Sequence, residues 1–192
     1  MKKNTVNLLL LLTITGIYPS GIHFPHVPDS LGRLKTCSYG SGGYYVKPGH
    51  NPEEAEKKIA EAAKTSAEDR MKSIICIRGI IDKSNKNEFL GLWENYTASI
   101  SHILSLNFQA IEFTHKNMSR NDKTAFEEFK KNKTELNKEL NFLTIQAIFD
   151  PKIKQEQLKH KLASAFYGIQ HVHLIFYSTI SEEFRKDISQ LF

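Results

Sequence analysis

The sequence predicts an all-α protein, an antiparallel up-down-up-down four-helix bundle with an extended N-terminal arm tied on by one disulfide. Apolar residues recur at three- and four-residue spacing over four long stretches, the period of helices that bury one face. Asn51-Pro52 and Asp150-Pro151 each combine a capping side chain with a proline, which is typical of helix starts. Proline and glycine gather in residues 22–50, where they prevent a long helix.

Residues 1–21 have the pattern of a secretory signal peptide. Lys2 and Lys3 precede an apolar run at residues 8–12 and a small-residue exit near Gly21, which is the order that signal peptides show. The apolar run is shorter than the roughly 20 residues that a membrane-spanning helix needs. We therefore expect a secreted, extracellular protein without a stable membrane anchor. The position of signal cleavage stays open.

Residues 22–50 form the expected arm, because their apolar side chains are too many for a freely solvated tail. In an oxidising compartment, Cys37 and Cys76 pair most simply into one disulfide. That bond would tie the arm to the first helix and stabilise the fold by on the order of 3–4 kcal/mol. Free thiols, an intermolecular bridge or a metal pair are the alternatives, although the chain has no Cys-x-x-Cys spacing. The tyrosines of the arm that could contact a partner are Tyr39, Tyr44 and Tyr45.

The helical domain is expected over residues 51–192, with four long helices and a short last one. Short turns between long helices make neighbours antiparallel. An alanine-rich first helix would then lie against a bulky fourth helix, and small residues against large ones fill a core without voids. The expected helices span residues of about 52–82, 87–116, 121–149, 151–178 and 181–190.

The net charge and three glycan acceptor triplets bear on which classes of partner are expected. The formal net charge of +5 falls to +3 when Lys2 and Lys3 leave with the signal peptide. The lysines between 130 and 138 are interleaved with Glu127, Glu128, Glu135 and Glu139, which is typical of a solvated helix face. A nucleic-acid partner, which needs a concentrated basic surface, is therefore not expected. Three Asn-x-Ser/Thr triplets would accept glycans in a eukaryotic host, and they begin at Asn95, Asn117 and Asn132.

Catalytic, cofactor and metal patterns are weak in this chain. Glu112 and His115 match the Glu-x-x-His element of di-iron bundles, but the sequence has no second copy. His171 and His173 lie about 200° apart around a helix, so they cannot chelate one ion together. We expect His171 to face water and His173 to pack beside the core. No nucleophile or phosphate-binding pattern has the required context. The sequence therefore predicts no enzyme, no cofactor and no metal site.

Two hypotheses about function remain. In the first, the protein binds an extracellular protein partner through the bundle surface and the tyrosine-rich arm, because tyrosine is favoured at interfaces. In the second, it carries a small apolar, lipid-like ligand between the helices. A membrane-active protein with splayed amphipathic helices is a weaker third alternative. The aromatic residues that would line the ligand site of a carrier are Trp93, Phe108, Phe142 and Phe166.

Overall fold

The computed structural model describes residues 51–81, 86–115, 117–150 and 152–191. Within these ranges the chain is helical and has no strand, which confirms the all-α prediction. No helix in the described ranges is both long enough and apolar enough to cross a membrane. The predicted signal peptide and arm lie outside the described residues. The described helices are α2 (Pro52–Ile80), α3 (Lys86–Thr114), α4 (Arg120–Phe149), α5 (Gln155–Thr179) and the short α6 (Glu182–Ser189).

Side-chain caps fix where α2, α4 and α6 begin. The Asn51 side chain accepts a hydrogen bond from the Glu53 N–H at 3.0 Å, and Pro52 occupies the first helical position. Ser119 caps α4 and Ser181 caps α6 in the same way. Each cap satisfies a backbone N–H that has no partner inside its helix. The Asn51-Pro52 signal for the start of α2 is therefore confirmed.

The start of α5 differs from the sequence prediction. α5 begins at Gln155 rather than near residue 151. Asp150 has an extended backbone at the end of α4, and its carboxylate accepts a hydrogen bond from the Lys152 N–H at 2.9 Å. The aspartate therefore forms a local turn instead of capping a helix directly. The N-cap position falls on Lys154, which makes no side-chain capping bond.

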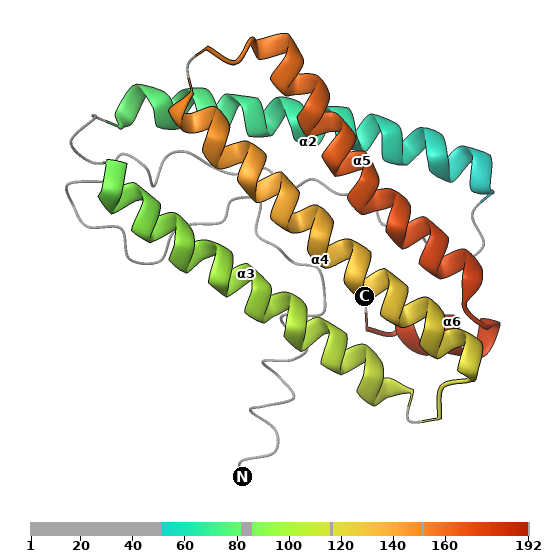
Figure 1. The fold of residues 1–192 in the computed structure, drawn as a ribbon. Coiled ribbons are helices and arrows are strands. Elements are labelled where there is room, and N and C mark those ends of the chain that lie inside the picture. The colour runs from blue at the N-terminus through green and yellow to red at the C-terminus, as the bar shows by residue number, and fades with distance from the viewer. Residues whose placement is uncertain (1–50, 82–85, 116, 151, 192) are drawn as a thin grey trace.

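The long helices alternate in direction along the chain, and α5 packs most extensively against α2 and α4 (Figure 1). Two cross-helix contacts fix the antiparallel register of α2 and α5. Glu56 lies 3.5 Å from His171, and Glu68 lies 2.8 Å from Lys159. The first long helix thus runs along the fourth, as the small-against-large pattern predicts. α3 is the outlying helix, because its main contacts are limited ones with α4 and α6.

Two clusters of buried side chains make up the core of the described residues. The first joins α2, α4, α5 and the beginning of α3, and the buried alanines of α2 let α5 approach closely. Gly168 of α5 leaves room for Leu136 of α4, whose Cδ2 would lie 3.1 Å from an added Cβ. The second cluster joins the end of α3, the beginning of α4, the end of α5 and α6. Phe184 and Ile188 anchor α6 there and are fully buried.

Arg78 connects the C-terminal ends of α2 and α4. Its Nε–H donates to the Ala147 carbonyl at 2.6 Å, and its Nη2 donates to the Ala147 and Asp150 carbonyls, the latter at 2.8 Å. Carbonyls in the last turn of a helix have no partner inside that helix, and the helix dipole places negative potential there. A cation from α2 therefore satisfies the end of α4.

Candidate functional site

A groove of about 240 Å³ lies between the middle parts of α3 and α4. The wall from α3 is mainly apolar, with two serines beside its three apolar side chains, and the wall from α4 is polar. Residues at four-residue spacing share one helix face, so each wall comes from a single stripe of its helix. The lining residues are Ile100, Ser101, Leu104, Ser105 and Phe108 on α3, and Lys130, Thr134, Asn137, Lys138 and Asn141 on α4.

Aromatic contacts hold α3 against α4 on either side of this groove. At one end, the ring of Phe108 lies 6.1 Å from that of Phe126 and 6.0 Å from that of Phe129. Toward the other end, the rings of Phe89 and Phe149 are 5.6 Å apart. Between these contacts, an apolar stripe faces amides and ammonium groups. Burying such polar groups against apolar side chains without hydrogen bonds is costly, which explains why the two walls stay open.

The side chains of the polar wall differ in how many of their polar groups are already bonded within the protein. Thr134 donates to the Lys130 carbonyl and Asn137 donates to the Lys133 carbonyl, both at 2.8 Å within α4. The Lys130 ammonium lies 3.5 Å from Glu112 of α3. Lys138 is exposed and makes no ion pair among the described residues. Lysine is thus the only charged residue type that lines this groove within the described ranges.

A basic pair lies between α4 and α5 beside the groove but does not line it. The Lys133 ammonium sits 5.4 Å from the centre of the Phe129 ring, and the His173 ring meets the same phenylalanine edge-on at 4.9 Å. Burial lowers the pKa of Lys133 to about 8. Burial, together with the Lys133 charge, lowers the pKa of His173 well below 6.5. The Lys133 charge therefore disfavours protonation of His173 beside the same phenylalanine ring.

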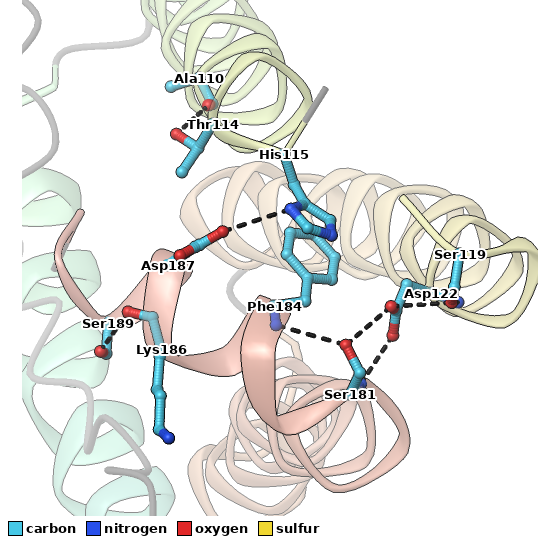
Figure 2. Close-up of polar contacts among 10 residues, drawn as sticks. All are labelled: Ala110, Thr114, His115, Ser119, Asp122, Ser181, Phe184, Lys186, Asp187 and Ser189. Atoms are coloured by element: carbon cyan, nitrogen blue, oxygen red, sulfur yellow. Dashed lines mark hydrogen bonds and ion pairs between the residues drawn. The ribbon is translucent and has the colours of Figure 1, made fainter. Parts of the chain in front are cut away.

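A polar cluster joins the beginnings of α4 and α6 (Figure 2). The buried carboxylate of Asp122 accepts hydrogen bonds from the Ser119 hydroxyl at 2.8 Å, the Ser181 hydroxyl at 2.8 Å and the Ser181 N–H at 2.7 Å. Burial by itself would raise the pKa of Asp122, but these hydrogen bonds and the nearby His115 outweigh it and lower that pKa. One carboxylate therefore ties together the capping serines of two helices.

This cluster contains serine, histidine and aspartate, the side chains of many hydrolases, but its connections are different. His115 Nδ1 lies 3.2 Å from Asp187, and its ring stacks on Phe184 at 4.9 Å between centroids. A serine nucleophile needs a base that accepts its proton. Here the hydroxyls of Ser119 and Ser181 both donate to the Asp122 carboxylate. The geometry fits a helix-capping clamp better than an activated nucleophile.

A second hollow, of about 510 Å³, lies where α3 gives way to α4. Its lining includes Glu112, Glu127 and Lys123, so it carries both signs of charge. It also includes Asn117, which begins one of the predicted glycan acceptor triplets. A glycan there would stand in the hollow. The groove between α3 and α4 is therefore the better candidate for a binding site.

The structure does not bring the four predicted lining aromatics to one place. Trp93 and Phe166 belong to the first core cluster, and Trp93 lies 6.0 Å from Phe89 between ring centroids. Phe108 belongs to the second cluster and also lines the groove. Phe142 is 63% exposed. Of these four, only Phe108 therefore lines the groove.

Some of the other predicted site residues lie in the described part of the chain, and the rest lie outside it. Cys37, Tyr39, Tyr44 and Tyr45 lie outside the described residues, so the disulfide and the tyrosine contacts stay predictions. Cys76 is half-buried on α2. The three asparagines of the glycan acceptor triplets are exposed, as a glycan requires, and their modification also stays a prediction. They are Asn95, Asn117 and Asn132.

The histidine predictions have clear outcomes. Glu112 contacts Lys130 while His115 contacts Asp187, so the two do not converge on one point. His171 reaches Glu56 at the surface and His173 packs on Phe129, as their spacing predicts. In the part of the chain that the structure describes, no three His, Cys, Asp or Glu side chains are grouped as metal ligands would be.

Sequence reasoning missed the polar wall of the groove. Lys130, Thr134, Asn137 and Asn141 recur at three- and four-residue spacing, and that pattern alone cannot distinguish a groove wall from a solvated face. Comparison of the chain with protein-family models, curated proteins and solved structures found no match. The function must therefore be argued from the geometry of the chain.

Proposed function

We propose that this chain is a secreted, non-catalytic protein that acts by binding an extracellular protein partner. The observation that carries the proposal is the open groove between α3 and α4, with an apolar wall and a polar wall. Protein interfaces combine an apolar centre with a polar rim in the same manner. In this proposal the long helices form an up-down-up-down bundle, and a Cys37–Cys76 disulfide fastens the tyrosine-rich arm to it.

Two features favour binding over catalysis. The groups with the chemistry for catalysis are engaged elsewhere, because Asp122 and Ser181 cap helices and Lys133 packs on an aromatic ring. The groove itself contains amides, hydroxyls, lysines and apolar side chains. General acid–base chemistry requires a titratable group within reach of the reacting atoms with a pKa near the working pH. The groove offers surface complementarity instead.

The proposal can be tested by comparing a variant inside the groove with a variant outside it. Leu104→Asn places an amide on the apolar wall of the groove, whereas Ile175→Asn makes a comparable change on α5, at an exposed residue outside the groove. Wild type and both variants would be immobilised on beads and incubated with extracellular fluid. The proteins that each one retains would then be quantified by mass spectrometry. The expected result is a protein that Ile175→Asn retains and Leu104→Asn loses, with direct binding then measured by calorimetry. If the two variants retain the same proteins, the groove is not the partner site.

A carrier of a small apolar ligand is the second candidate, and the groove also supports it because Ile100, Leu104 and Phe108 could contact an acyl chain. The volume of about 240 Å³ is below the roughly 300–1,000 Å³ of typical ligand pockets. An open groove also leaves much of a small ligand in water. Native mass spectrometry of the secreted protein separates the candidates, since a carrier would show an extra mass that organic extraction removes.

A further inference from the structure

The α3–α4 groove has a spacing and a charge that restrict its occupant. We infer that it receives an acidic, amphipathic helical segment of a partner protein, an inference that rests on the proposed function. Helices commonly bind by placing an apolar face into a groove, with contacts at i, i+3 or i+4 and i+7. Each wall of this groove matches one face of such a helix.

The apolar wall provides the length for about two turns of a partner helix. Ile100, Leu104 and Phe108 follow one another at four-residue spacing on α3. From the first to the last is about 12 Å along the axis, at 1.5 Å per residue. A partner helix that presents apolar residues over two turns would cover the half-buried Ile100 and Leu104 and reach the small exposed part of Phe108. These contacts would supply most of the affinity, because the burial of apolar surface is the main driving force of association.

The polar wall sets the charge of the partner. Lys130 and Lys138 are the charged residues among those that line the groove, and no carboxylate lines it within the described ranges. They are also separated by about 12 Å along α4, which is two helical turns. Carboxylates two turns apart on a partner helix would reach Lys138 and, in competition with Glu112, Lys130. Like charges at these positions would be repelled, so the lysines act mainly on partner choice and association rate.

The same spacing disfavours an anionic lipid as the main occupant. A single headgroup cannot reach two ammonium groups that are about 12 Å apart along one helix. Lys130 already contacts Glu112 at 3.5 Å, which leaves the exposed Lys138 as the more available cation. The predicted glycan acceptors Asn95, Asn117 and Asn132 are not among the residues that line the groove.

The test uses two labelled synthetic peptides with the mature secreted protein. Both are helical and carry leucine at i, i+4 and i+7; one has glutamates flanking the apolar face, and the other has lysines in their place. Fluorescence anisotropy gives the affinities. We expect the acidic peptide to bind at least about fivefold more tightly, from surface charge pairs. Lys138→Glu should reverse this preference. Lys131→Glu, the same charge change at an exposed residue that does not line the groove, should leave it in place.

Three results would overturn the inference: equal binding of the two peptides, the same effect from Lys138→Glu and Lys131→Glu, or binding of dodecanoate but not of the acidic peptide. The outcome separates this inference from the proposed function. If Leu104→Asn abolishes capture of a natural partner while the peptides show no charge preference, only the acidic-helix inference fails. If Leu104→Asn leaves partner capture unchanged, the groove is not the partner site, and the groove-based proposed function fails as well.

Discussion

Replacing Lys133 with methionine should stabilise the protein. The pKa of Lys133 is lowered by burial from 10.5 to about 8, so the folded state disfavours its charged form. At about 1.36 kcal/mol per pKa unit, this difference corresponds to a penalty of about 3 kcal/mol near neutral pH. The ammonium recovers part of that through its contact with the Phe129 ring, on the order of 1 kcal/mol. Methionine keeps an unbranched stem and packs well on aromatic rings, so we expect a net gain of about 1–3 kcal/mol.

The pH dependence gives this prediction a definite sign. Because the folded pKa is lower, the unfolded state binds more protons between pH 8 and 10.5. The stability of the wild type should therefore rise through that window, and Lys133→Met should remove this contribution. Burial raises the pKa of Tyr177 to about 12, which acts in the opposite direction at high pH. Since that contribution is common to both proteins, the difference between them isolates Lys133.

Urea denaturation followed by circular dichroism, near pH 7 and near pH 10, measures both effects. Lys131→Met is the matched control, because Lys131 is exposed on the same helix. Both substitutions keep Asn132 and Thr134, so the glycan acceptor triplet is intact. In the same variant, the pKa of His173 measured by NMR should move upward but stay low, because burial is its larger cause. Equal stability of the two variants, or an unchanged pH difference, would refute the assigned burial penalty.

Three further predictions concern stability and share the denaturation assay. Asp122→Ala should cost about 2–4 kcal/mol, because it leaves buried hydrogen-bond donors without an acceptor. The wild type should lose this stability as the pH falls below 3.8, since the pKa of Asp122 is lowered in the folded state. A variant as stable as the wild type would rule out the helix-capping clamp. Arg78→Met should cost about 1–3 kcal/mol by removing the cation from the end of α4, and Arg78→Lys should restore part of it; equal losses in both would contradict a charge contribution. Reduction of the predicted Cys37–Cys76 bond should cost on the order of 3–4 kcal/mol, and Cys37→Ser should make the protein insensitive to reductant. An unchanged midpoint in reduced wild type would exclude this stabilising role.

The helix starts could be predicted because they depend on neighbouring residues. Asn51 with Pro52, Ser119 and Ser181 each act within their own first turn, so the signal is local. The start of α5 shows the limit of the same reasoning. A carboxylate followed by proline can cap a helix or close a turn, and Asp150 closes a turn with Lys152.

The position of α3 could not be read from its apolar stripe. Periodicity tells which face of a helix is buried, but it does not tell which helix covers that face. Phe89 and Phe108 lie on one stripe, yet they belong to different core clusters near opposite ends of α3. The aromatics expected to line one cavity are separated for this reason. The groove arises from the way the facing stripes of α3 and α4 meet, which no local pattern encodes.

The polar side chains of the groove lower the stability of the protein but keep the groove available for binding. Substitutions that remove them can measure this trade-off. Asn137 and Asn141 face the apolar wall of α3 across the groove. Leucine at both positions would add apolar contacts with Ile100 and Leu104, each buried leucine being worth about 1.5–3 kcal/mol when fully covered. Asn137→Gln with Asn141→Gln is the control, since glutamine and leucine have similar helix propensities. If the groove is a binding site, the leucine variant should unfold at higher urea and lose the acidic peptide, while the glutamine variant should keep binding. A leucine variant that gains stability and still binds the peptide would place the site elsewhere on the surface.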